Sequence, residues 1–336
     1  MSLLKINNLK VEFDTFGGTV HAVRGVDLIV NSGETLAIVG ESGCGKSVTF
    51  QSIMGLLPMP PGRIKSGTAL FENQDLLKLS EKESRSLRGS QIAMIFQDPM
   101  TSLNPTKTIG DQISETLIVH KGMSKSEAMK ESLRLLELTR IAEAKKRLTQ
   151  YPFEFSGGML QRVMIAMAVA CKPKLLIADE PTTALDVTIQ DQILSLLKDL
   201  QKENDMALVL ITHDLGVVAR MADQVSVMYA GQVVENGSVD DIFYRSAHPY
   251  TLGLKQALPS HSEGNKGELT AIDGIPPDLF APPKGCSYTA RCPYAMKCCE
   301  SSAPKTFQPA QSHFSRCWLQ HDQAPKTEAL FCGDRK

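Results

Sequence analysis

An eight-residue stretch of the chain has the residue types and spacing of a phosphate-binding loop: Gly40, Glu41, Ser42, Gly43, Cys44, Gly45, Lys46 and Ser47. Its pattern, G-x-x-x-x-G-K-S, lets the backbone curl so that successive N–H groups point at the phosphates of a nucleotide. Lys46 is expected to reach the β- and γ-phosphates, and the Ser47 hydroxyl to bind Mg²⁺. Val48 then opens a helix whose N-terminal dipole adds to the anion site.

Polar residues follow three further apolar runs, where buried strands are expected to end: Gln97 after 92–96, Asp179 and Glu180 after 175–178, and His213 after 207–211. Asp179 suits a contact to Mg²⁺, and Glu180 can polarise an attacking water. Gln97 is placed to sense Mg²⁺ or a water, and His213 to contact the γ-phosphate. We expect all four at one edge of an open α/β sheet, where ligands collect in such folds.

A second anion site is suggested by Ser156, Gly157 and Gly158, which precede an apolar helix expected over 163–170. Backbone N–H groups and a hydroxyl at a helix start can hold a phosphate. Alone, this pattern is more often a plain helix cap. Asp186 adds a further candidate, because it lies between the acidic pair and an amphipathic helix.

These residues need elements to position them. The apolar run 36–39 predicts a buried strand before the loop, and 48–57 suits the helix after it. Alternation over 3–13 and 19–30 predicts an antiparallel hairpin with its turn at 14–18. Phe13 could stack on a nucleotide base, with Phe16 as second choice, or either ring could simply pack in the sheet. Residues 109–148 have helical apolar spacing and predict an inserted helical subdomain.

Composition limits the function classes. The chain has 336 residues and a net charge of −1, so no bulk electrostatic attraction to nucleic acid or anionic membrane is evident. No signal peptide and no transmembrane helix are expected. The length allows two domains.

Cysteines gather in a Pro- and Gly-rich tail, which we expect to bury little apolar surface by itself. Six of the eight lie after residue 285: Cys286, Cys292, Cys298, Cys299, Cys317 and Cys332. Four of them supply enough thiolates for one zinc ion or one iron–sulfur cluster: Cys286, Cys292, Cys299 and Cys317. Tight C-x2-C pairs are absent, and the wide spacing suits a larger cubane better. Cys298 competes with Cys299, Cys332 is expected outside the site, and unligated thiols are the alternative.

The set formed by the loop 40–47, Gln97, 156–158, Asp179-Glu180, Asp186 and His213 resembles the ATPase subunit of ABC transporters over residues 3 to about 245. The resemblance implies an α/β P-loop (RecA-like) core with an antiparallel β subdomain and a helical subdomain inserted at about 100–160. In that family Glu180 is the catalytic base, His213 the switch histidine and Gln97 the glutamine that contacts Mg²⁺ and the membrane subunit. It also implies a head-to-tail dimer in which each ATP lies between one subunit's phosphate loop and the other's signature segment.

The signature segment 156–159 departs from the commonest family pattern, with Phe155 for Leu and Met159 for Gln. Met159 cannot offer the hydrogen bonds of an amide. The serine hydroxyl and glycine N–H groups remain, so phosphate recognition is expected to survive.

A narrower resemblance is to the ATP-binding subunits of dipeptide/oligopeptide permeases, through 97–105, 155–162, His248-Pro249-Tyr250 and the cysteine-rich tail. It implies an ATPase domain over 1–245 and an extension over 246–336 with a [4Fe-4S] cluster. The implied partners are two transmembrane permease subunits, a second similar ATP-binding subunit in a heterodimer, and an extracytoplasmic peptide-binding protein. The implied location is the cytoplasmic face of the bacterial cell membrane.

Other functions remain open. Some members of this branch import nickel or other small solutes. A soluble ABC protein acting on DNA or ribosomes generally carries two cassettes in one chain, whereas this chain has one and lacks a dense basic tract. A non-catalytic regulatory subunit is disfavoured because Glu180 and His213 are both present.

Overall fold

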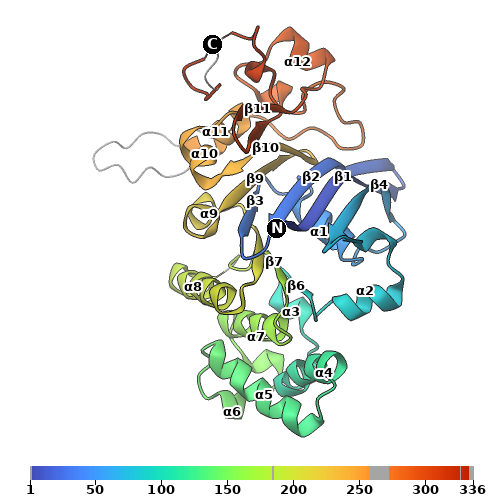
Figure 1. Cartoon of the computed structure of the whole chain (residues 1–336), viewed down its shortest axis with the longest axis vertical. Coiled ribbons are helices and arrows are strands. Elements are labelled where there is room, and N and C mark those ends of the chain that lie inside the picture. The colour runs from blue at the N-terminus through green and yellow to red at the C-terminus, as the bar shows by residue number, and fades with distance from the viewer. Residues whose placement is uncertain (1, 184, 258–271, 326, 333–336) are drawn as a thin grey trace, which may run out of the picture. The chain divides into compact units, whose positions relative to one another are not determined.

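The computed structural model describes residues 2–183, 185–257, 272–325 and 327–332 (Figure 1). Its contacts divide the chain into two compact units. The phosphate-loop unit comprises residues 4–29, 36–77 and 212–336, and the helical unit comprises 1–3, 30–35 and 78–211.

A four-stranded sheet of the phosphate-loop unit begins with the expected hairpin. Its order is β2-β1-β4-β5, and its strands are β1 (Ser2–Thr15), β2 (Gly18–Asn31), β4 (Gly62–Phe71) and β5 (Gln74–Asp75). The strands are longer than predicted, and the turn shrinks to Phe16 and Gly17. Strand β1 runs antiparallel to β4, with Leu4 opposite Phe71. Leu9 and Val11 are fully buried, as the alternating pattern indicated.

Five more strands of this unit pair in the order β11-β12-β10-β9-β3: β11 (Phe307–Ala310), β12 (His313–Ser315), β10 (Gln232–Ser238), β9 (Gln224–Tyr229) and β3 (Thr35–Val39). Strand β3 is parallel to β9, and the remaining pairs are antiparallel. The unit's α-helices are α1 (Lys46–Ile53), α9 (Leu215–Met221), α10 (Val239–Tyr244), α11 (Pro249–Gln256) and α12 (Lys297–Ser301). Helix α1 ends earlier than residue 57, because Gly55 takes a left-handed conformation with φ of 63°.

The C-terminal extension, which the sequence predicts to bury little apolar surface by itself, packs a few apolar side chains into buried clusters of this unit. Tyr288 packs in one apolar cluster with Tyr229, Tyr250 and Ile242. Cys317, Leu319 and Leu330 form a second buried cluster. The sequence does not predict this packing, because the apolar residues of the extension are spaced irregularly. They come together only through turns, 3₁₀ segments and the short strands β11 and β12.

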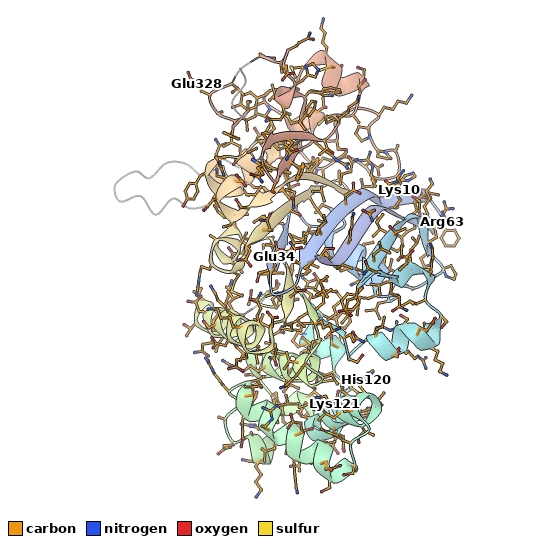
Figure 2. All side chains as sticks on the ribbon, in the orientation of Figure 1. Lys10, Glu34, Arg63, His120, Lys121 and Glu328 are labelled. Atoms are coloured by element: carbon orange, nitrogen blue, oxygen red, sulfur yellow. The ribbon has the colours of Figure 1, made fainter. Side chains whose placement is uncertain are left out.

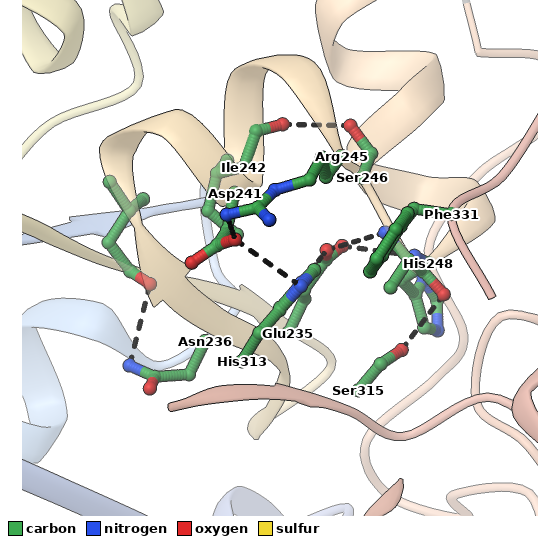
Figure 3. Close-up of polar contacts among 12 residues, drawn as sticks. Glu235, Asn236, Asp241, Ile242, Arg245, Ser246, His248, His313, Ser315 and Phe331 are labelled. Atoms are coloured by element: carbon green, nitrogen blue, oxygen red, sulfur yellow. Dashed lines mark hydrogen bonds and ion pairs between the residues drawn. The ribbon is translucent and has the colours of Figure 1, made fainter. Parts of the chain in front are cut away.

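A buried polar group attaches β12 to β10 (Figure 3). The Nε2 atom of His313 lies 2.8 Å from Oε1 of Glu235, and both side chains are fully buried. Glu235 also accepts the backbone N–H groups of Ala247 (2.6 Å) and His248 (3.0 Å). The ring of His313 stacks on Phe331. Because a buried carboxylate is costly without partners, this set of contacts specifies how the extension packs.

The helical unit contains three parallel strands in the order β8-β7-β6: β8 (Ala207–Ile211), β7 (Leu175–Asp179) and β6 (Ile92–Ile95). Its α-helices are α2 (Glu81–Leu87), α3 (Pro99–Ser102), α4 (Ile109–Lys121), α5 (Lys125–Leu138), α6 (Ala144–Arg147), α7 (Gly157–Val169) and α8 (Val187–Asn204). Helices α4, α5 and α6 confirm the predicted helical insert. Helix α5 starts at a capping box in which Ser124 and Glu127 satisfy each other's backbone N–H groups.

Helices α4, α5 and α7 pack on one another through apolar side chains. Leu117, Leu136 and Leu160 are fully buried in this unit. Lys121 lies at the end of α4 (Figure 2). It donates a hydrogen bond of 2.9 Å to the carbonyl oxygen of Ala170, just after α7. A cation at a helix C-terminus is also favoured by the helix dipole. Among the described residues, none of the helices has the length and apolar character needed to span a bilayer.

Replacing His313 tests the attachment of the extension. His313→Ala leaves the buried Glu235 carboxylate with only its two backbone partners, a loss expected to cost about 3–5 kcal/mol of stability. We expect a lower Tm and faster proteolysis within 290–332. Phe314→Ala, at the half-exposed neighbouring position, is the control and should change both far less. Equal effects of the two substitutions would contradict the assigned role of His313.

Candidate active site

The phosphate loop, residues 40–47, lies between the fully buried strand β3 and helix α1. Three glycines take positive φ angles, of 151° at Gly40, 77° at Gly43 and 95° at Gly45. A Cβ atom at Gly40 would lie 2.1 Å from the carbonyl oxygen of Met228, and one at Gly45 would lie 2.5 Å from that of Ala22. Gly43 has open space around it. Two of the glycines are therefore required by neighbouring backbone as well as by the turn.

Lys46 is buried in the loop, with its ammonium 2.8 Å from the carbonyl oxygen of Gly40 and 3.0 Å from that of Glu41. Cys44 is buried, and its carbonyl accepts the N–H of Gly231 at 3.0 Å. Ser42 is exposed, while Ser47 and Val48 are half-buried. The loop thus presents an open rim, with its lysine already held inside, as phosphate binding requires.

Glu41 and Tyr250 form a contact that sequence reasoning missed. The backbone N–H of Glu41 donates to the hydroxyl of Tyr250 at 2.9 Å. Tyr250 is fully buried and packs on Tyr229 and Tyr288. The segment His248-Pro249-Tyr250 is one of those that resemble peptide-permease subunits, but the resemblance implies no structural role for it. Its tyrosine fixes one end of the phosphate loop.

His213 follows β8 and precedes α9 in the phosphate-loop unit. The N–H of Thr212 donates to the carbonyl of Ile38 at 3.1 Å, which places His213 near the carboxyl end of β3. Asp214 then caps α9 through the N–H groups of Gly216 and Val217. The His213 side chain is exposed.

In the helical unit, Gln97 and Glu180 meet at the ends of β6 and β7, where Ile95 pairs with Ala178. The Gln97 amide donates to Glu180 Oε2 at 3.0 Å, and the Thr183 hydroxyl donates to the same atom at 2.8 Å. Glu180 has a φ of 46°, a left-handed conformation that costs on the order of 1–3 kcal/mol and is common at functional sites.

Asp179 at the end of β7 is buried, with 3% of its surface exposed. A buried carboxylate followed by a strained glutamate that is held by an amide and a hydroxyl is an arrangement suited to a cation and a water. The structure thus joins Gln97 to Glu180 as expected. Thr183 is an added contact that the sequence did not reveal.

The signature residues differ from the expectation in one respect. Helix α7 begins at Gly157 rather than at 163, so both glycines belong to its first turn and Ser156 is the N-cap. The Ser156 side chain makes no capping hydrogen bond, and the residue is exposed. A Cβ atom at Gly158 would lie 2.8 Å from Cγ2 of Ile189, so this glycine is also needed for the approach of α8. Asp186 accepts the N–H of Ile189 at 2.9 Å and caps α8.

The two candidate aromatic residues have different surroundings. Phe13 is half-buried, and its ring packs on Gly62 of β4. Phe16 is fully exposed in the hairpin turn. Which of them stacks on a base stays a prediction.

The four cysteines named from spacing line a single cavity. Its wall includes Cys286, Cys292, Cys299 and Cys317, together with Tyr288, Tyr294 and Trp318. Cys298, the competitor of Cys299, is exposed and is not part of this wall. Cys332 also lies outside the wall and its thiol approaches the carbonyl of Leu319 at 3.7 Å.

Close backbone packing brings these cysteines together. The N–H of Cys286 donates to the carbonyl of Cys299 at 2.7 Å, and a Cβ atom at Gly285 would lie 2.1 Å from the same oxygen. Burial raises the pKa of Cys292 to about 11 and also raises the pKa of Cys286, Cys299 and Cys317. Within the described residues, no three His, Cys, Asp or Glu side chains are arranged to hold a metal ion. The prediction of a metal centre is therefore not confirmed.

The phosphate loop offers a matched pair of glycine substitutions. Gly40→Ala places a methyl group against the carbonyl of Met228, whereas Gly43→Ala meets no atom within 4 Å and carries only the strain of its φ angle. We expect Gly40→Ala to lower the Tm of the nucleotide-free protein strongly, and Gly43→Ala to cost about 1 kcal/mol. Calorimetry without nucleotide makes this comparison. A larger loss for Gly43→Ala would be inconsistent with the described loop.

Both the ATPase domain and the C-terminal extension match families of known proteins. Residues 23–183 match the family "ABC transporter", and residues 234–299 match "Oligopeptide/dipeptide transporter, C-terminal region". The chain is 58% identical to the oligopeptide transport ATP-binding protein OppD of Bacillus subtilis, over 97% of this chain and 91% of that protein. It is 56% identical to the dipeptide transport ATP-binding protein DppD of the same organism, over 99% of each.

Solved structures give the same fold. A dimeric post-hydrolysis state of the ATP-binding cassette MJ0796, bound to ADP and Pi, matches with a TM-score of 0.64 and 29% identity, over 70% of this chain and 98% of that one. The cassette cbiO1 of Clostridium perfringens matches with a TM-score of 0.60 and 31% identity, over 72% and 90%. The chain therefore belongs to the ATP-hydrolysing subunits of ABC transporters, within the oligopeptide and dipeptide branch of that family.

Proposed function

We propose that the chain hydrolyses ATP to power the import of dipeptides or oligopeptides through a membrane permease. The observation that carries this proposal is the likeness to peptide-transport ATP-binding proteins along nearly the whole chain, with the extension included. Similarity confined to the ATPase domain would indicate ATP hydrolysis but not the transported substrate. The expected partners are two permease subunits, a second ATP-binding subunit and an extracytoplasmic peptide-binding protein, with this chain peripheral on the cytoplasmic face of the membrane.

The roles of the site residues follow from their chemistry. Loop N–H groups and Lys46 would bind the phosphates of ATP. Ser47 and Asp179 would be the protein ligands for Mg²⁺, which would neutralise phosphate charge. Glu180 accepts a proton from the attacking water, and Gln97, hydrogen-bonded to Glu180, orients that water or senses Mg²⁺. His213 contacts the γ-phosphate.

The signature segment has the features of a second phosphate-binding element. Ser156 is an exposed N-cap with no capping bond of its own, and Gly157 has no neighbour closer than 3.9 Å to an added Cβ. We infer that a partner ATPase subunit brings its nucleotide to this helix start. Asp186 supports the arrangement by capping α8.

Two substitutions separate binding from chemistry. Glu180→Gln should keep ATP affinity but lower the hydrolysis rate by at least 100-fold, on the order of a lost general base. Lys46→Ala should weaken ATP binding itself. ATP titration and phosphate release by the assembled transporter measure the two effects. A near wild-type rate for Glu180→Gln would refute the assignment of the base.

We propose that the four cysteines lining the cavity hold a [4Fe-4S] cluster rather than zinc. Their spacing lacks the tight C-x2-C pairs usual for structural zinc. Four thiolates are the ligand set of such a cluster, and its bonds to Cys286, Cys292, Cys299 and Cys317 would cross-link the extension. Its role would be structural, because ATP hydrolysis transfers no electrons.

The colour and iron content of anaerobically purified protein test this site. We expect broad absorption near about 400 nm and about four irons per chain. Cys292→Ser should abolish both, whereas the exposed Cys298→Ser should keep them. Colourless protein with one tightly bound zinc would refute the cluster and retain the four-cysteine site, and metal-free wild-type protein would refute both.

A further inference from the structure

The extension and the phosphate loop are joined by a partly buried ion pair, although its members are 250 residues apart. Nη1 of Arg291 lies 2.7 Å from Oε2 of Glu41, and Nη2 lies 2.9 Å from Oε1. Only 5% of the Arg291 side chain is exposed, compared with 28% for Glu41. Such bidentate contacts fix the direction of both side chains and are among the stronger polar interactions in proteins.

Other contacts hold the guanidinium group in place. Its Nε donates to the carbonyl of Asp273 at 3.0 Å, and Nη2 also donates to that of Ile272 at 3.2 Å. Nη1 donates to the Tyr229 hydroxyl at 3.3 Å, and the group lies over the same ring, 5.8 Å from its centre. An arginine guanidinium group stays protonated in proteins. Arg291 is therefore a permanent cation whose position is specified by four neighbours.

Glu41 is held at every polar group it has. Its N–H donates to Tyr250, its carbonyl accepts from Lys46, and its carboxylate binds Arg291. It directly follows Gly40, whose φ of 151° is accessible mainly to glycine. A loop with several glycines gains conformational freedom when such anchors are lost, and that freedom must be lost again when phosphates bind.

Charge adds a second effect. Glu41 places a carboxylate in the loop that receives a polyphosphate anion, and like charges in one site repel each other. Arg291 is the cation that compensates this carboxylate among the contacts described. Removing Arg291 would both loosen the loop and leave Glu41 opposed to the incoming nucleotide.

We propose that Arg291 is a positioning residue for the phosphate loop, through which the cysteine-lined cavity of the extension sets the affinity for ATP. Arg291 ends the 3₁₀ segment Thr289–Arg291 and directly precedes Cys292, which lines the cavity. Whatever holds Cys286 and Cys292 therefore also holds Arg291. Since coupling between two sites is reciprocal, nucleotide binding should also stabilise the cysteine site. This second step rests on the proposed cysteine site, whereas the positioning of the loop does not.

The test compares Arg291→Ala with Arg316→Ala in the full chain. Both arginines lie in the extension, both directly precede a cysteine of the cavity, and Arg316 pairs with Asp27, 3.3 Å away, rather than with the phosphate loop. Titration with Mg-ATP should show a Kd raised about tenfold for Arg291→Ala, as for the loss of one charged hydrogen-bonding group. Arg316→Ala should leave the Kd unchanged, and Arg291→Lys should recover part of the affinity.

Two further readouts separate positioning from simple loss of structure. In the assembled transporter, Arg291→Ala should raise KM for ATP more than it lowers kcat. Adding Glu41→Gln to Arg291→Ala should restore part of the affinity, because the uncompensated charge is removed. An unchanged Kd for Arg291→Ala, or an equal rise for Arg316→Ala, would overturn the positioning role.

A separate experiment tests the coupling between the cysteine-lined cavity and the affinity for ATP. Cys292→Ser should raise the Kd for ATP in the wild-type background and add nothing in the Arg291→Ala background. If Cys292→Ser leaves the Kd unchanged while Arg291→Ala raises it, the coupling is overturned and the positioning role stands. Wild-type protein that lacks iron would refute the cluster of the proposed function without affecting the Arg291 comparison.

Discussion

The phosphate loop depends on close backbone contacts that only glycine permits. At Gly40 and Gly45 the positions that side chains would occupy are taken by carbonyl oxygens of Met228 and Ala22. The loop is therefore shaped by β9 and β2 as much as by its own sequence. These neighbours restrict the conformation of the loop backbone. That restriction allows Lys46 and the N–H groups of the loop to face a polyphosphate. The rest of the phosphate-loop unit maintains those neighbours.

The extension belongs to that supporting structure. Strands β11 and β12 continue the sheet that contains β3, and buried contacts of His313 with Glu235 attach them. Tyr250 and Arg291 then hold the backbone and the side chain of Glu41. A segment that looks appended in sequence is thus part of the environment of the nucleotide site.

The helical unit holds the side chains of an acid, Glu180, and an amide, Gln97, in contact with each other. Glu180 takes a left-handed backbone conformation, and Gln97 and Thr183 bind one of its oxygens. Gly158 serves two purposes, since its missing side chain admits Ile189 and its N–H lies in the first turn of α7. Structural and functional requirements coincide at such positions, so neither can be assigned by residue type alone.

The sequence by itself determined the phosphate loop, the strand ends that carry Gln97, Asp179, Glu180 and His213, the helical insert and the four cysteines. These features are local patterns of spacing and apolar periodicity, which follow from backbone geometry over a few residues.

Only the tertiary structure decided that α7 starts at Gly157, that the extension adds to a core, and that Arg291 reaches Glu41. Those outcomes depend on contacts between distant segments. The side chains involved carry no periodic signal, because turns and 3₁₀ segments of the extension, rather than regular helices or strands, bring them together.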